Sequence, residues 1–258
     1  MYEEFFGLRE KPFSILPDSD FLYLTTQHER ALLTLEYGIF EQTGITVLTG
    51  GVGCGKTTIV RKLLKEVSYD AMTVGLISNV HESLGTLLDW VTIAFDLPTY
   101  DKKIDTFRHF QSFVVEQYIA EKTTLLIIDE AQNLSGDNLE ELRMLMNINA
   151  DKNHLLQILL VGQPELETIL AKPELIQIAQ RVTCKAKIEQ LTLPEVAQYI
   201  PFRLRSAGAP TTIFSDSATR KVFQLSKGVP RIVNVICDRA MVLAYGAGSP
   251  QVECEHIE

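Results

Sequence analysis

The sequence predicts an α/β fold in which helices cover both faces of a mostly parallel β-sheet, followed by a small helical part. Short apolar runs, rich in β-branched residues, alternate with longer amphipathic stretches, which is the pattern of βα units. After residue 192 the apolar runs stop, and amphipathic stretches separated by Gly and Pro remain. We therefore expect an α/β core at residues 1–191 and a helical part at residues 192–258.

The periodicity assigns each element in turn. Strands are expected at four apolar runs and one weaker alternating run, at 45–49, 72–78, 124–128, 155–161 and 185–191. Helices are expected at nine amphipathic stretches, at 28–41, 56–68, 82–95, 104–121, 137–149, 164–171, 194–207, 215–226 and 230–246. No run approaches the roughly 18 consecutive apolar residues of a membrane-spanning helix, so none is predicted.

Composition and charge exclude several classes of protein. The 258 residues are 46% hydrophobic and 22% charged, which excludes a mostly disordered chain, a collagen-like fibre and a coiled-coil rod. The net charge of −9 argues against nucleic acid as the main partner, although a local basic strip on the C-terminal part stays open. Four widely spaced cysteines and a start without signal-peptide features predict a cytoplasmic protein with reduced thiols.

Residues 50–57 match the pattern GxxxxGK[ST] between a predicted strand and a predicted helix, which is the context of a phosphate-binding loop. The glycines let the backbone N–H groups face a phosphate, and the helix N-terminus adds positive potential. Lys56 is expected to reach the β- and γ-phosphates, and the Thr57 hydroxyl to bind Mg²⁺. The expected nucleotide-binding residues are Gly50, Gly51, Val52, Gly53, Cys54, Gly55, Lys56, Thr57 and Thr58.

A second motif, residues 125–132, consists of four apolar residues followed by Asp129, Glu130, Ala131 and Gln132. A buried parallel strand delivers such carboxylates at its C-terminal end, where these sheets bind ligands. Asp129 is expected to bind nucleotide-associated Mg²⁺, and Glu130 to activate the attacking water as a general base. Many strands end in acids, but together with the upstream phosphate loop this motif indicates nucleotide hydrolysis.

These motifs and the helical C-terminal part resemble the AAA+ branch of P-loop ATPases. Further blocks are similar to the ExeA/GspA-type ATPases of type II secretion and related pilus systems, at residues 5–8, 11–13, 28–32, 139–143, 160–166, 180–182 and 228–231. A more distant relationship to transposition ATPases of the MuB/TnsC kind is also implied. The resemblance implies a three-layer αβα core with a small C-terminal helical lid, and ATP and Mg²⁺ as cofactors.

The resemblance also implies four catalytic roles. Asn79 would be a polar switch that holds Glu130 away from the water, and its alternative role is a turn former. Gln163 would be sensor 1, with capping of the following helix as the alternative. Arg231 would be sensor 2 and contact the γ-phosphate from the lid. Arg181 would be an arginine finger that acts on a neighbour's nucleotide, with a pair to surface acids as the alternative.

Two functions follow from the resemblance. The first is an ATPase that forms a head-to-tail homo-oligomer, ring or helical, with protein partners of a secretion or pilus machine. Full-length relatives continue into a transmembrane helix and a periplasmic domain, so this chain is expected to be a soluble version or a part. The alternative is a DNA-binding transposition regulator that recruits a transposase, which the negative charge disfavours. A third reading, a switch that barely hydrolyses, is disfavoured by Glu130.

The N-terminal aromatic residues have two alternative interpretations. Phe5, Phe6, Phe13, Phe21 and Tyr23 either line the adenine pocket or pack the first helix onto the core. The five histidines show neither metal-ligand spacing nor a cysteine partner, so no metal site is predicted at any of them. His28 is interpreted as structural.

Overall fold

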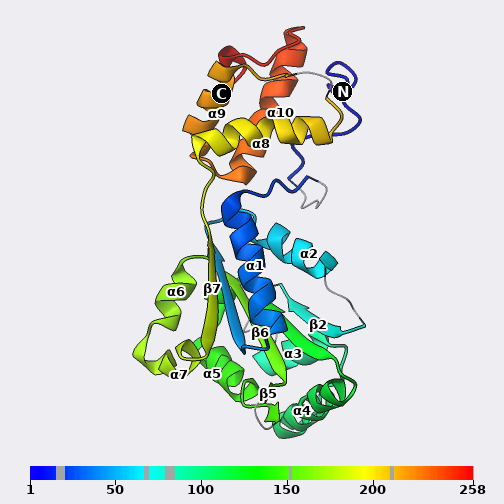
Figure 1. Cartoon of the computed structure of the whole chain (residues 1–258), viewed down its shortest axis with the longest axis vertical. Coiled ribbons are helices and arrows are strands. Elements are labelled where there is room, and N and C mark those ends of the chain that lie inside the picture. Colours follow the sequence, from blue (N-terminus) through cyan, green and yellow to red (C-terminus); the bar gives the residue numbers. More distant parts are fainter. Residues whose placement is uncertain (16–20, 67–69, 79–84, 151–152, 210–211, 258) are drawn as a thin grey trace. The chain divides into compact units, whose positions relative to one another are not determined.

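The computed structural model describes residues 1–15, 21–66, 70–78, 85–150, 153–209 and 212–257 (Figure 1). The chain divides into two compact units. The sheet unit comprises Glu29–Gly50 and Leu63–Lys187. The helical unit comprises Met1–His28, Gly51–Lys62 and Ile188–Glu258. The predicted boundary near residue 192 stays a prediction.

A five-stranded sheet forms the centre of the sheet unit. Its strands are β1 Ile45–Gly50, β2 Met72–Ile77, β3 Thr123–Ile128, β6 Leu156–Gly162 and β7 Val182–Ile188. They lie in the order β2-β3-β6-β1-β7, and the pairs β2/β3, β3/β6 and β6/β1 are parallel. Leu125, Leu126, Ile127 and Ile128 are all completely buried, so both faces of β3 are covered. The predicted α/β class is confirmed.

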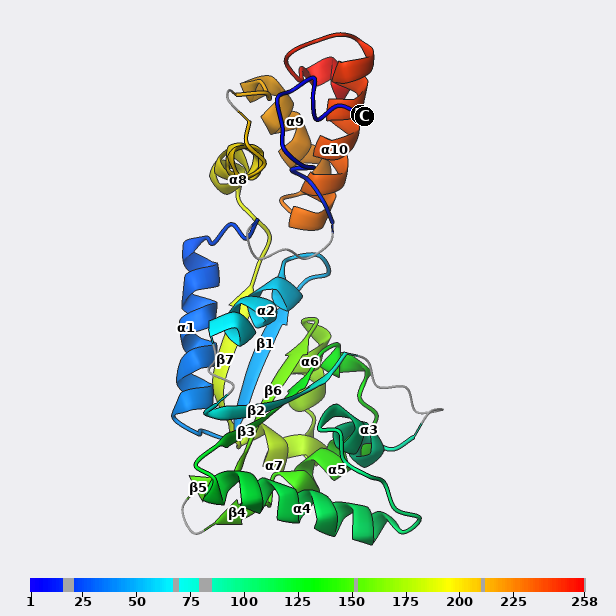
Figure 2. The same ribbon diagram turned by 90° about the vertical axis from the view of Figure 1, so that its right-hand side faces the viewer.

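Helices flank this sheet on both sides. They are α1 Thr26–Phe40, α3 Leu87–Ala94, α4 Lys103–Ile119, α5 Gly136–Leu145, α6 Glu165–Leu170 and α7 Ile176–Ala179. Helix α2, Lys56–Glu66, belongs mostly to the helical unit. Figure 2 shows α1 on one side of the sheet and α3 and α5 on the other. A Cβ on Gly38 would lie 2.1 Å from the Thr46 hydroxyl oxygen, so this glycine lets α1 approach β1 closely.

Some elements differ from the sequence prediction. The last strand begins at Val182 and ends at Ile188, earlier than predicted, and α5 ends at Leu145. The described part of the predicted helix 82–95 begins after Thr86, whose capping box with Asp89 stabilises its first turn. A hairpin of β4 Asn149–Ala150 and β5 Asn153–His154, the 3₁₀ turn η3 Pro173–Leu175 and α7 are too short to leave a periodic signal.

Three helices form most of the helical unit: α8 Leu193–Ser206, α9 Asp216–Ser226 and α10 Pro230–Gly246. The 3₁₀ turn η4 Cys254–His256 follows them. Aromatic residues of the N-terminal segment pack into the same hydrophobic cluster, namely Tyr2, Phe6, Phe13 and Phe21. The structure therefore places these rings against the C-terminal helices of the same unit. Hydrophobic periodicity could not predict this packing, because the two segments are far apart in the sequence.

Arg203 on α8 joins the N-terminal segment to the helices. Its side chain is 7% exposed, and its Nε donates a hydrogen bond of 2.6 Å to the Pro12 carbonyl. The guanidinium also lies 4.7 Å from the centre of the Phe21 ring, within the range of a cation–π contact. Its Nη1 and Nη2 donate to the Tyr199 hydroxyl and the Ser14 carbonyl, so each guanidinium nitrogen has a partner and this buried charge is costly to disrupt.

We expect Arg203→Ala to lower the free energy of unfolding by about 3 kcal/mol, because the buried Pro12 carbonyl would lose its donor. Chemical denaturation followed by circular dichroism measures the change. Arg205→Ala is the matched control, since Arg205 is exposed on the same helix, and should change stability by less than about 0.5 kcal/mol. Equal stabilities of the two variants would contradict this assignment.

Candidate nucleotide-binding and catalytic site

The predicted phosphate loop lies in the helical unit, between the end of β1 and the start of α2. Gly53 and Gly55 have φ angles of +75° and +101°, a conformation that glycine adopts without steric cost. The Cys54 backbone N–H donates to the Gly51 carbonyl over 3.3 Å, which closes a tight turn. The loop therefore has the curled backbone that presents N–H groups to an anion.

Lys56 and the start of α10 both contact this loop. The Lys56 side chain is 6% exposed, and its Nζ donates to the Gly51 carbonyl over 3.2 Å. The Arg231 backbone N–H donates to the Gly53 carbonyl over 3.3 Å. A Cβ on Gly53 would lie 2.8 Å from the Arg231 Cβ, so only glycine allows this approach. The structure thus brings the predicted sensor 2 residue beside the phosphate loop.

His28 and Cys54 form the inner side of the loop. The His28 Nδ1 lies 2.7 Å from the Thr25 hydroxyl. Burial lowers the pKa of His28, and a hydrogen bond with the Cys54 backbone offsets part of this effect. Burial also raises the pKa of the Cys54 thiol, which is 1% exposed. Both side chains are therefore uncharged at neutral pH and support the loop from inside the protein.

The acidic residues lie at the carboxyl edge of the sheet unit. Parallel pairing matches Ile128 of β3 with Leu160 of β6, and Gly162 of β6 with Thr49 of β1, so the three strands end at one edge. Asp129 and Glu130 follow β3 directly. Glu130 has a φ angle of +52°, which is uncommon outside glycine. Its N–H donates to Asp129 Oδ1 over 2.9 Å, so the chain turns sharply at this edge.

Two glutamine side chains meet the Glu130 carboxylate. Gln163, the residue after β6, donates from its side-chain amide to Glu130 Oε2 over 3.3 Å. Gln132 donates to the same oxygen over 2.6 Å and accepts the Gln163 backbone N–H over 2.9 Å. The Gln163 backbone carbonyl accepts the Leu166 N–H over 2.9 Å at the start of α6, while its side chain bonds to Glu130. Capping of α6 by Gln163 stays an alternative. The role of sensor 1 stays a prediction.

Sequence reasoning assigned no role to Gln132, although it belongs to the Asp-Glu-Ala-Gln run. The available signal was its position, because a long amide side chain two residues after a catalytic carboxylate can reach that carboxylate. Asn79, the predicted switch residue, lies outside the described residues.

Arg181 lies at the opposite edge of the sheet. It immediately precedes β7, and its carbonyl oxygen would lie 3.8 Å from a Cβ on Gly44, just before β1. Its guanidinium donates to the Met146 carbonyl and to Asn147 Oδ1, each over 2.8 Å. It therefore pairs with the end of α5, and with no acid among the residues that the structure describes. The length of the strands, roughly 20 Å, separates this edge from the edge at Glu130.

The oxygen donors at the two motifs suit a magnesium ion. Mg²⁺ prefers carboxylate and hydroxyl oxygens and keeps several waters. Thr57 of the helical unit and Asp129 of the sheet unit each offer an oxygen of this kind, and their role as magnesium ligands stays a prediction. Within the described ranges, no three His, Cys, Asp or Glu side chains gather as a metal cage. A cation shared with a nucleotide fits this donor set better than a cation bound by protein alone.

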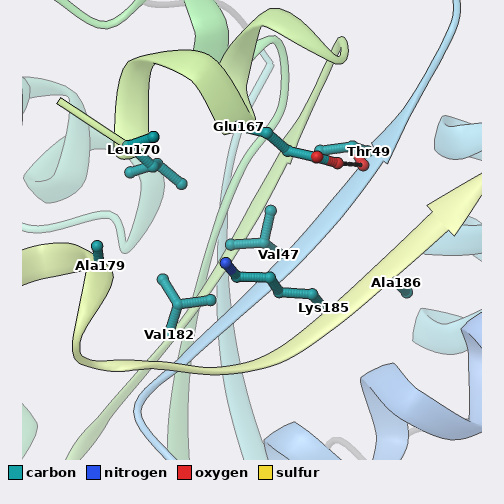
Figure 3. Close-up of a pocket in the computed structure, with 9 residues that line it drawn as sticks. Val47, Thr49, Glu167, Leu170, Ala179, Val182, Lys185 and Ala186 are labelled. Atoms are coloured by element: carbon teal, nitrogen blue, oxygen red, sulfur yellow. Dashed lines mark hydrogen bonds between the residues drawn. The ribbon is translucent and has the colours of Figure 1, made fainter.

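A separate small pocket lies between β1, α6 and β7 (Figure 3). It has a volume of about 90 Å³, and the amino group of Lys185 points toward it. At its rim the Thr49 hydroxyl donates to Glu167 Oε1 over 2.6 Å. This bond joins β1, just before the phosphate loop, to the helix that follows Gln163. The predicted catalytic and nucleotide-binding residues do not line this pocket.

A parallel sheet, a phosphate-loop motif after its β1 strand and an Asp-Glu pair at the end of β3 are the features of a P-loop ATPase. Residues 40–170 match the model of the AAA domain family, and the chain belongs to this family. The fold and the family together assign the chain to the nucleotide-binding ATP hydrolases.

Known proteins agree with this assignment. The chain is 39% identical over 255 residues to General secretion pathway protein A of Aeromonas hydrophila, covering 98% of this chain and 46% of that protein. Its fold is similar to ORC2 of Aeropyrum pernix, with a TM-score of 0.66, 15% identity and coverage of 96% and 70% of the two chains. Cdc6p of Pyrobaculum aerophilum gives a TM-score of 0.68, 16% identity and coverage of 93% and 67%. In the described part of the chain, every helix is too short or too polar to cross a membrane.

We expect Lys56→Ala to weaken ATP binding at least about a hundredfold, because the phosphates would lose a charge-assisted hydrogen bond inside a narrow loop. Titration with a fluorescent ATP analogue measures the affinity. Lys65→Ala, at an exposed position in the last turn of α2, is the control and should leave the affinity unchanged. Unchanged affinity in Lys56→Ala would remove the phosphate-loop assignment.

Proposed function

We propose that this chain binds and hydrolyses Mg-ATP in order to drive or regulate assembly of a cell-envelope secretion or pilus machine. The observation that carries the hydrolytic part is the Glu130–Gln163 hydrogen bond, which joins the proposed base to the proposed sensor at the carboxyl edge of the sheet. The 39% identity to General secretion pathway protein A supports the biological part. The activity, partners and location of the whole protein belong to this proposal, because the chain spans about half of that relative.

Each proposed role follows from the chemistry of the residue. Lys56 binds the β- and γ-phosphates, while Thr57 and Asp129 hold Mg²⁺, which neutralises phosphate charge. Glu130 accepts a proton from the attacking water, and the Gln163 amide orients that water or the γ-phosphate.

Arg231 links the nucleotide to the lid. Its backbone contact with Gly53 supports this role, because a shift of the phosphate loop is transmitted directly to the start of α10. We retain Asn79 as the proposed switch residue.

We expect Glu130→Gln to lower turnover about a thousandfold and to keep nucleotide affinity, since the variant loses the base and retains Lys56, Thr57 and Asp129. Phosphate release and nucleotide titration measure the two quantities. Glu165→Gln, an exposed carboxylate in the first turn of α6, is the control and should hydrolyse ATP at the parent rate. Parent-rate hydrolysis by Glu130→Gln would assign the base to another residue.

We further propose that the chain assembles head to tail with copies of itself, on the cytoplasmic side where ATP is available. The position of Arg181 supports this arrangement. It lies at the amino edge of the sheet, so it is remote from the Glu130 of its own chain and suited to act on a neighbour. A heterologous interface of this kind builds rings or helical filaments.

We expect Arg181→Ala to bind ATP and lose hydrolysis, because the finger neutralises charge that develops only during phosphoryl transfer. Mixing it with Glu130→Gln should restore part of the activity, since unlike neighbours can combine an intact Glu130 with an intact Arg181. Phosphate release from the mixture measures the rescue, and cross-linking verifies co-assembly. Co-assembly without any rescue would contradict the role of Arg181 and make Arg143, which pairs with Glu140, the next candidate.

A further inference from the structure

Gln132 is the residue that connects the proposed base with the proposed sensor. Its side-chain Nε2 donates to Glu130 Oε2 over 2.6 Å, and its side-chain Oε1 accepts the Gln163 backbone N–H over 2.9 Å. One side chain therefore joins the turn after β3 to the end of β6. These are the two neighbouring strand ends that supply Glu130 and Gln163.

The local backbone is built for this contact. Glu130 adopts a left-handed conformation, and the 3₁₀ turn η2 Ala131–Asn133 follows it at once. This reversal directs Gln132 back toward the carboxylate. On the other side, a Cβ on Gly162 would lie 2.9 Å from Gln132 Oε1. The absence of a side chain at Gly162 is what gives the Gln132 amide its place at the end of β6.

The two amides use only one side of the carboxylate. Gln132 and Gln163 both donate to Oε2 of Glu130, whereas Oε1 accepts no hydrogen bond from the residues that the structure describes. An anchored Oε2 restricts rotation of the carboxylate and leaves Oε1 as the oxygen that can accept a proton. Such orientation of a reacting group contributes strongly to catalysis.

We infer that Gln132 is a positioning residue for ATP hydrolysis, which orients the Glu130 carboxylate and couples it to Gln163. This inference rests on the proposed role of Glu130 as general base. Gln132 acts through Glu130 and does not touch the nucleotide. Removal of the Gln132 side chain should therefore lower kcat and leave nucleotide binding unchanged.

Three variants test the inference. Gln132→Ala should lower kcat about tenfold, with KM and the affinity for a fluorescent ATP analogue changed less than about twofold. Gln132→Glu is isosteric and still accepts the Gln163 N–H, but it cannot donate to Glu130, so kcat should fall at least as far. Gln157→Ala is the matched control. The Gln157 side chain also accepts the Gly44 backbone N–H and donates to the His154 carbonyl, but Gln157 lies at the amino end of β6.

Two further measurements separate positioning from a general effect on the fold. In the Glu130→Gln background, Gln132→Ala should cause no additional loss of turnover, because the group on which it acts is already absent. In nucleotide-free protein, thermal unfolding of Gln132→Ala, Gln163→Ala and the double variant should be non-additive, since the two residues share hydrogen bonds.

The inference is overturned if Gln132→Ala keeps the parent kcat or exceeds it, or if Gln132→Glu retains full activity. A loss in Gln132→Ala that equals the loss in Gln157→Ala, or a parallel loss of nucleotide affinity, overturns it too. An active Glu130→Gln variant would instead overturn the proposed function itself. If Glu130→Gln is inactive but Gln132→Ala is fully active, the inference about Gln132 fails while the proposed function stands.

Discussion

The parallel pairing of β6 with β3 on one side and β1 on the other is the constraint on which the sheet unit depends. It aligns three carboxyl ends at one edge, so that residues far apart in sequence follow neighbouring strands. Asp129 and Glu130 follow β3, and Gln163 follows β6. The burial of both sheet faces by helices holds this alignment, because a shifted strand would expose apolar side chains to water.

Side-chain hydrogen bonds further fix the residues that follow the strand ends. Gln132 and Gln163 bind the same oxygen of Glu130, and Thr49 binds Glu167 on the helix that follows Gln163. These contacts involve residues at or shortly after the carboxyl ends of β3, β6 and β1. The carboxyl end of the sheet therefore carries two sets of polar contacts, and within the Gln132–Glu130–Gln163 set an altered residue affects its partners.

In the helical unit, the phosphate loop is held by close contact between its backbone and the start of α10. Gly53 contacts the start of α10, and Lys56 bonds to Gly51, so the phosphate loop and the third helix of the lid form one packed element. The N-terminal segment adds to this unit through Arg203 and the buried ring of Phe21. The hydrogen bond between Gly53 and Arg231 therefore connects the loop to the first turn of α10, which begins at Pro230.

The sequence by itself determined the α/β class, most strand positions, the phosphate loop and the acidic strand end, because each depends on contiguous residues and local periodicity. Only the tertiary structure decided that β6 lies between β3 and β1, that Gln132 bridges Glu130 and Gln163, and that Arg181 lies at the opposite edge. It also decided that the N-terminal aromatic rings pack with the C-terminal helices. Strand order and such distant contacts arise from the packing of whole elements, and no local pattern in the chain encodes them.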